Sequence, residues 1–175
     1  FVISGNKCYA IARDAAGAWA VTQTYDNTLA TSTGIVKSAS SNFAYSSPGA
    51  SADEVFADGA QLYTIYRSNT GDGEVSDFGK WSQISWFSEP DIEDVSHVSY
   101  IDGYFVFNEV GTSRFRTLSA GGVTSDPLEF ASAEGDPDNL VAVIALNRDL
   151  WLLGAGSIEV WVNTGNVDFP FERVQ

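Results

Sequence analysis

The sequence predicts an all-β fold built from repeated antiparallel units, and three observations support this prediction. Short apolar or aromatic-rich runs alternate with turn residues along most of the 175 residues. Helical periodicity is scarce, because no stretch of ten or more residues repeats its apolar positions every 3.6 residues. Candidate turns recur at near-regular intervals, which is typical of a chain that repeats one supersecondary unit.

Four candidate turns mark the repeat, at Gly5, Gly59, Gly103 and Arg148. The intervals between them are 54, 44 and 45 residues, from 5 to 59, 59 to 103 and 103 to 148. Asp-Gly between two apolar runs, as at Gly59 and Gly103, favours a hairpin, because a type I′ turn needs positive φ at its central residues. Asn147 and Arg148 break this pattern, so we expect a longer or differently shaped turn in the last unit.

Apolar or aromatic-rich strands are expected directly after these turns, at residues 7–11, 62–66, 104–107 and 150–153. Further strands are expected at 114–118 and 158–162, which gives three or four short strands per unit. Such a unit must stack on its neighbours to bury both faces. Its length of about 44–54 residues fits the antiparallel blade of a β-propeller. We therefore expect residues 1–175 to form three to four blades of a larger propeller, truncated at both ends.

The charge of the chain argues against a nucleic-acid-binding surface. Formal net charge is −14, from 23 acidic and 9 basic residues. Phosphate recognition needs clustered Lys and Arg, and the sequence has no such cluster beyond Arg114 and Arg116 on one strand face. We therefore do not expect direct DNA contact by this segment.

Residue types that carry catalysis or bind metals are sparse. His97 is the single histidine, and we interpret it as a surface or strand-edge residue. No Gly-x-Ser-x-Gly nucleophile elbow is present. Two acidic clusters, at 89–94 and 134–138, are interpreted as solvated turns whose Asp side chains cap backbone N–H groups, with calcium binding as the alternative. We expect a non-enzyme with no catalytic, cofactor-binding or metal-binding residues.

Other composition features exclude further classes. The lone Cys8 cannot form a disulfide within the chain, and we interpret it as a small buried side chain. No run approaches the roughly 18 apolar residues that a transmembrane helix requires, so no membrane contact is expected. The five tryptophans lie within or beside apolar runs, and most are expected between blades, while one or two at a rim could hold a sugar or peptide.

An ordered series of motifs in residues 81–175 resembles the phage stabilisation protein family. It runs through Trp-Phe-Ser-Glu-Pro at 86–90, Leu-Trp-Leu-Leu-Gly at 150–154 and Phe-Pro-Phe at 169–171. Residues 1–80 match by blade pattern alone. The family-motif residues, for which structural roles are expected, are Asp102, Gly103, Tyr104, Glu134, Asp138, Asn139, Trp151, Gly154, Glu159, Trp161, Asn163, Gly165 and Pro170.

The resemblance implies a virion structural protein, a packaged-DNA stabilisation protein and tail accessory factor of short-tailed phages. Such proteins form part of the neck or tail hub below the portal, help close the channel, and attach distal tail components. Expected partners are therefore the portal or adaptor ring, tail needle or fibre proteins, and further copies in a ring. The expected location is the virion, after synthesis in the bacterial host cytoplasm. Two alternatives remain open: a carbohydrate-binding or receptor-binding propeller, and a generic protein-interaction propeller.

Overall fold

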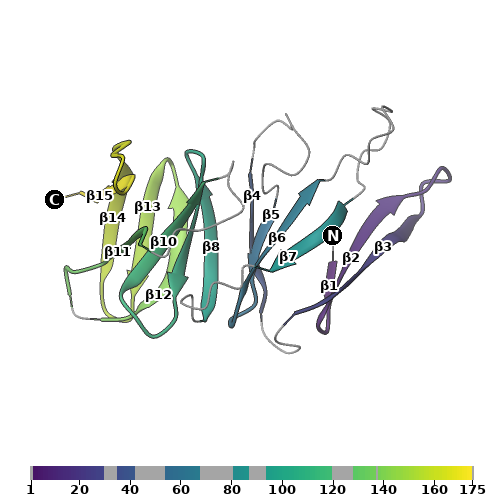
Figure 1. Ribbon diagram of the computed structural model, residues 1–175, viewed down its shortest axis with the longest axis horizontal. Coiled ribbons are helices and arrows are strands. Elements are labelled where there is room, and N and C mark those ends of the chain that lie inside the picture. Colours follow the sequence, from purple (N-terminus) through teal and green to yellow (C-terminus); the bar gives the residue numbers. More distant parts are fainter. Residues whose placement is uncertain are drawn as a thin grey trace.

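The computed structural model describes residues 2–29, 35–41, 54–67, 81–86, 94–119, 128–136 and 138–174. Within these residues all regular secondary structure is β-strand, and the strands form four antiparallel sheets (Figure 1). The all-β prediction is confirmed. No described residue belongs to a helix that is long and apolar enough to cross a membrane.

In every sheet, strands that are neighbours in space are also consecutive in the chain. The first sheet contains β1 (Val2–Ser4), β2 (Lys7–Arg13) and β3 (Trp19–Thr28). The second sheet contains β4 (Lys37–Ser40), β5 (Glu54–Ala57), β6 (Leu62–Arg67) and β7 (Trp81–Trp86). The third sheet contains β8 (Val95–Ile101), β9 (Tyr104–Glu109), β10 (Arg114–Ser119) and β11 (Phe130–Ser132). The fourth sheet contains β12 (Leu140–Leu146), β13 (Asp149–Gly154), β14 (Ile158–Asn163) and β15 (Phe171–Arg173).

The four sheets stand in a row in chain order, with the first and fourth sheets at its two ends (Figure 1). The first strand of the third sheet, β8, contacts the first strands of both neighbouring sheets, β4 and β12. The first and second sheets meet through their last strands, β3 and β7. Each inner sheet therefore has a neighbour on both faces.

Alternation of side chains across a strand explains how one sheet supplies two interfaces. Val55 on β5 packs toward the third sheet, against Phe105 and Phe107, whereas the adjacent Phe56 packs toward the first sheet, against Cys8. Val106, between Phe105 and Phe107, faces the fourth sheet and joins a core with Leu150 and Leu152. The described residues thus form three apolar cores, one between each pair of neighbouring sheets.

Each of the four candidate turns lies between two antiparallel strands. Gly5, at φ 61°, opens the two-residue turn between β1 and β2, and this position suits glycine in a type II′ turn. Asp102 and Gly103 both have positive φ, as the sequence predicts for a type I′ turn. Asp58 and Gly59 differ, because β5 and β6 are joined by four residues in which the Asp58 carboxylate accepts hydrogen bonds from the N–H groups of residues 60 and 61.

The expectation of a longer or differently shaped turn at Asn147 and Arg148 is wrong. The two residues join β12 directly to β13, and their φ values are 53° and 68°. Both are therefore in the left-handed region, as are Asp102 and Gly103 in the third sheet. Asn tolerates this conformation well, and the strand pairing on either side holds Arg148 in it as well.

Candidate functional site

The junction between the third and fourth sheets contains most of the sequence-predicted motif residues. The connector between β11 and β12, residues 133–139 with Pro137 outside the described part, crosses from one sheet to the other. Two backbone hydrogen bonds tie its ends to the β9–β10 turn, from Ala133 N–H to the Ser113 carbonyl at 2.9 Å and from Leu140 N–H to the Thr112 carbonyl at 2.8 Å. The connector is thus anchored to the third sheet at both ends.

Glu159 on β14 holds the middle of the connector from the fourth sheet. Its carboxylate accepts hydrogen bonds from Gly135 N–H at 2.5 Å and from the indole Nε1–H of Trp161 at 2.8 Å, and it pairs with Arg173 at 3.5 Å. Glu159 is 8% exposed, and buried carboxylates are costly unless such partners surround them. Strand alternation places Glu159 and Trp161 on the same side of β14, which brings the two side chains together.

Asp138 holds the C-terminal part of the connector against the β13–β14 turn. Its carboxylate accepts hydrogen bonds from the N–H groups of Gly156 at 2.6 Å and Ser157 at 3.1 Å, and from the Ser157 hydroxyl at 2.9 Å. These bonds, with that from Gly156 N–H the largest contributor, lower the pKa of Asp138 below its usual value. The charged form is favoured because each bond is donated to the carboxylate.

Asp138→Asn is expected to lower stability at neutral pH and to matter progressively less in acid. The folded pKa of Asp138 lies below the unfolded value of about 3.9. The stabilisation by the ionised carboxylate is therefore complete above the unfolded pKa and is lost as pH falls through the folded pKa. Urea denaturation midpoints of wild type and variant at pH 7 and pH 2.5 measure this, with exposed Asp168→Asn as the matched control. A difference that is as large at pH 2.5 as at pH 7 would contradict the assignment.

Gly154, at the end of β13, leaves no room for a side chain. A Cβ atom there would lie 2.4 Å from Oδ1 and 2.7 Å from Cγ of Asp138. Gly154→Ala is therefore expected to displace the Asp138 carboxylate and to destabilise the protein by about 1–3 kcal/mol. Gly156→Ala is the matched control, because its Cβ would meet Asp138 at an ordinary 3.7 Å. Equal thermal midpoints for the two variants would show that the close approach is unimportant.

Three further motif residues, Asp102 and Tyr104 at the β8–β9 turn and Trp161 on β14, lie at the same junction between the third and fourth sheets. Asp102 pairs with Arg148 of the fourth sheet at 3.4 Å, although Arg148 is highly exposed and such pairs contribute little. The Tyr104 ring meets Phe171 edge-on at 5.9 Å between ring centres. Trp161 is buried against Phe115, also edge-on, at 5.0 Å. These contacts give the junction an aromatic core beneath its polar rim.

The remaining motif residues lie in the connector, on β13 and around the β14–β15 turn. Asn163 Oδ1 accepts a hydrogen bond from Gly165 N–H at 2.9 Å, and Gly165 has a φ of 69°. The carbonyl of buried Pro170 accepts a hydrogen bond from Thr164 N–H at 2.9 Å. Glu134 and Asn139 are exposed. Trp151 is half-buried on β13, on the strand side opposite Leu150 and Leu152.

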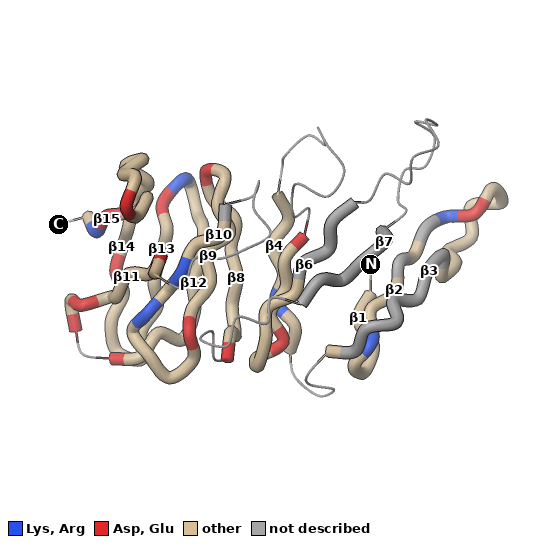
Figure 2. Tube along the Cα trace, viewed as in Figure 1, with Lys and Arg blue, Asp and Glu red and all other residues tan. Residues whose placement is uncertain are grey.

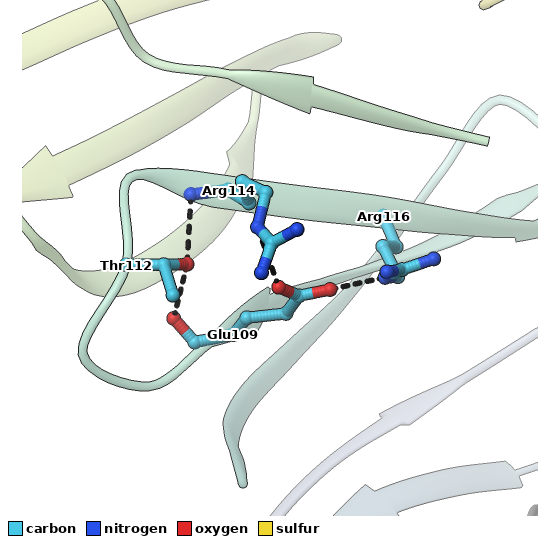
Figure 3. Close-up of polar contacts among 4 residues, drawn as sticks. All are labelled: Glu109, Thr112, Arg114 and Arg116. Carbon is cyan, nitrogen blue, oxygen red and sulfur yellow. Dashed lines mark hydrogen bonds and ion pairs between the residues drawn. The ribbon is translucent and has the colours of Figure 1, made fainter. Parts of the chain in front are cut away.

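A buried charge cluster in the third sheet was not predicted from the sequence. Glu109, at the end of β9, is 3% exposed and pairs with Arg114 at 2.9 Å and with Arg116, both on β10 (Figure 3). Thr112 fixes the intervening turn, since its hydroxyl donates to the Glu109 carbonyl and accepts from Arg114 N–H, each at 3.0 Å. The same two guanidinium groups lie over the ring of Phe130 on β11. Glu109 thus pairs with two arginines whose guanidinium groups lie beside an aromatic ring.

A comparison with sequence models of protein families matches residues 19–175 to the family described as bacteriophage P22 Gp10, β-propeller. The match covers most of the chain. The protein belongs to this phage stabilisation family. No curated protein matches the sequence significantly.

Membership of the phage stabilisation family confirms the resemblance and the β-propeller class of the fold. The family is that of the P22 packaged-DNA stabilisation protein, which is a structural protein of the phage. The protein therefore has a phage structural role, and its family indicates a location in the virion.

Other sequence-predicted features of this family member can be placed in the structure. His97 is half-buried on β8, its Nδ1 lies 3.1 Å from the Ser96 hydroxyl, and burial lowers its pKa. Among the described residues, no three His, Cys, Asp or Glu side chains are grouped so that they could hold a metal ion. The acidic cluster at 89–94 lies outside the described residues except for Asp94.

The tryptophans divide between core and surface. Trp161 is buried and Trp151 is half-buried, but Trp19 is 65% exposed and carries the Arg13 guanidinium over its ring at 5.1 Å. The side chains of Trp81 and Trp86 lie outside the described part of the structure. The junction as a whole presents hydrogen bonds, ion pairs and packed rings that join two sheets, which is an arrangement suited to holding structure.

Proposed function

We propose that the protein is a structural component of the phage tail hub below the portal, where it helps to retain packaged DNA and attaches distal tail components. The observation that carries this proposal is the match of residues 19–175 to the phage stabilisation family. Further copies in a ring, the portal or adaptor ring, and tail needle or fibre proteins are the proposed partners. Synthesis takes place in the host cytoplasm before assembly.

The motif residues have mechanical roles in this proposal. Two carboxylates join the connector to the fourth sheet: Glu159 binds Gly135 of the connector, and Asp138 of the connector binds Gly156 of the β13–β14 turn. Trp161 of the fourth sheet packs on Phe115 of the third. A protein that resists the pressure of packaged DNA benefits from links between neighbouring sheets, because each sheet contacts only its neighbours. In this proposal residues 1–175 form about three to four blades of a larger β-propeller and carry out no catalysis.

Retention of DNA is proposed to be mechanical, without direct contact between this segment and the duplex. Asp and Glu are spread along the row of sheets in the described part, while Lys and Arg are few (Figure 2). The pair Arg114 and Arg116 is engaged by Glu109. An acidic surface repels phosphates and keeps DNA from adhering to the wall of a channel.

The experiment that tests this proposal is a cryo-electron reconstruction of the phage particle that contains the protein. The decisive question is where density for Leu150–Gly165 lies relative to the portal ring. Density in a symmetric ring below the portal is the expected result. Density on a peripheral fibre would refute the tail-hub role and would favour a receptor-binding propeller instead.

A further inference from the structure

The turn between β12 and β13 contains a residue that its backbone conformation disfavours. Asn147 and Arg148 have φ values of 53° and 68°, and a two-residue turn with positive φ at both positions favours the pair Asn-Gly. The corresponding turn of the third sheet has glycine at the second position, Gly103. An arginine in the left-handed region is strained, because its Cβ atom approaches a carbonyl oxygen. Arg148 therefore makes this turn less stable than glycine would.

The ion pair that Arg148 forms within the chain does not explain why this strain is kept. Arg148 Nε lies 3.4 Å from Oδ1 of Asp102, and the Arg148 side chain is 84% exposed. Exposed ion pairs of this kind contribute little to stability. A strained residue without a matching gain in stability indicates that its side chain serves a function.

The end of the sheet at which Arg148 lies stays accessible when another sheet is stacked beside it. The third sheet contacts both the second and the fourth, and its Asp102 occupies the position equivalent to Asn147. Asp102 is nevertheless exposed, although Arg148 covers part of its side chain. Neighbouring blades meet through their faces, whereas these turns lie at the ends of strands. Arg148 is therefore expected to remain accessible in a complete propeller.

The β14–β15 connection lies at the same end of the fourth sheet as Arg148. Asp149, which follows Arg148, pairs with Val162 near the end of β14, and Val162 pairs with Glu172 of β15. The connection is drawn in yellow at the upper end of the fourth sheet (Figure 1). Two strand spacings separate the turn from the connection, a distance of about 10 Å. The two elements therefore form one surface at the rim of the sheet.

The β14–β15 connection presents Val167 on an ordered backbone. The side chains of Asn163 and Asn166 each accept a hydrogen bond from the N–H group two residues later, at 2.9 Å and 3.1 Å. Phe169 anchors the connection by packing edge-on against Phe115 of the third sheet. Val167 itself is 95% exposed. An ordered loop loses little conformational entropy on binding, so it can present Val167 as an apolar anchor.

Arg148 and Val167 together define the chemistry of a partner. The guanidinium group binds a carboxylate or a phosphate through two parallel hydrogen bonds. Asp149 and Asp168 lie in the same turn and connection, and the chain carries a net charge of −14, so a row of DNA phosphates would be repelled more strongly than a single carboxylate. Arginine is common at the centre of protein–protein contacts. The surface therefore fits a protein with a carboxylate about 10 Å from an apolar recess.

We propose that Arg148 and Val167 form a docking site for another protein of the phage particle, whose carboxylate replaces Asp102 on the Arg148 guanidinium. The pair with Asp102 is weak enough to be exchanged at small cost. The inference rests on the proposed structural role in the virion and adds the surface and the chemistry of one contact. Replacement of Arg148 by glycine is then expected to change stability and docking in opposite directions.

The first test measures stability. Arg148→Gly is expected to raise the thermal midpoint by about 2 °C or more, because glycine relieves the strain in the turn. Asn147→Gly is the matched control in the same turn, and its midpoint is expected to change less, because asparagine tolerates the left-handed region. A lower midpoint for Arg148→Gly than for wild type would show that Arg148 is kept for its ion pair with Asp102 and would overturn the proposal.

The second test measures docking. Phage particles assembled without this protein are incubated with labelled full-length protein, and the bound fraction is measured by co-sedimentation. Arg148→Gly and Val167→Ser are each expected to raise the apparent dissociation constant by about tenfold or more, whereas Asn147→Gly is expected to bind as wild type does. Equal binding of Arg148→Gly and wild type, or no binding of wild type, would overturn the docking site.

Two other kinds of partner give distinguishable results. Short duplex DNA that binds wild type and is released by Arg148→Gly would show that the guanidinium binds phosphate. Self-association that is seen in sedimentation velocity and lost in Arg148→Gly would show that the contact joins two copies of this protein. Either result would refute docking to another protein.

The tail-hub role fails separately from the docking site. Density on a peripheral fibre in the reconstruction would remove that role, while a tenfold effect of Arg148→Gly on binding to particles would still establish a contact with another particle protein. Density below the portal together with equal binding of Arg148→Gly and wild type would leave the tail-hub role and remove the docking site.

Discussion

Glu109→Ala is expected to destabilise the protein by about 2–4 kcal/mol, because it removes a buried carboxylate that forms ion pairs with both Arg114 and Arg116. Arg116 is 3% exposed, so water cannot replace the lost partner without opening the sheet. Urea denaturation followed by tryptophan fluorescence measures the effect. Glu134→Ala removes an exposed carboxylate and is the matched control, with an expected change within about 0.5 kcal/mol.

A double variant separates the loss of a charge pair from a general intolerance of substitution at Glu109. Glu109→Leu with Arg116→Met replaces both buried charges by apolar side chains of similar length. Since such exchanges are often neutral or stabilising, this variant is expected to recover most of the stability lost in Glu109→Ala. A double variant that is less stable than Glu109→Ala would show that Glu109 and Arg116 stabilise the third sheet by interactions other than the attraction between their two charges.

Leu150→Ala is expected to destabilise the protein by about 2–5 kcal/mol, since it leaves a cavity between the third and fourth sheets. Leu150 is fully buried and belongs to the same core as Phe115 and Trp161. Leu128→Ala provides the same substitution at a side chain that is 82% exposed, with an expected change within about 0.5 kcal/mol. Thermal midpoints of the two variants measure the difference, and similar midpoints would contradict the assignment of this core.

The repeat could be predicted from the sequence because its signals are local. Apolar alternation and turn residues identified hairpins around Gly5, Gly59, Gly103 and Arg148, and the structure has antiparallel strands on both sides of each. The form of individual turns was harder to predict. At Arg148 the strand pairing imposes the left-handed region on a residue that does not favour it, so the absence of glycine was misleading.

The polar contacts of the junction could not be predicted, because they depend on how distant segments are placed. Arg114 and Arg116 were recognised as neighbours on one strand face, but their partner Glu109 is defined by the register of β9 with β10. Asp138 was expected to cap backbone N–H groups in its own turn. It instead accepts hydrogen bonds from residues 156 and 157, which lie beyond two further strands.

The consecutive order of strands within each sheet also has a consequence for synthesis. Every hydrogen-bonded strand pair joins neighbours in the chain, so each sheet needs only its own segment, such as the 45 residues between the last two turns, to complete its pairing. Short sequence separation between partners lowers the entropy that must be lost before contacts form. The sheets are therefore expected to acquire structure one after another as the ribosome releases them, with each new sheet forming on the exposed face of the one before.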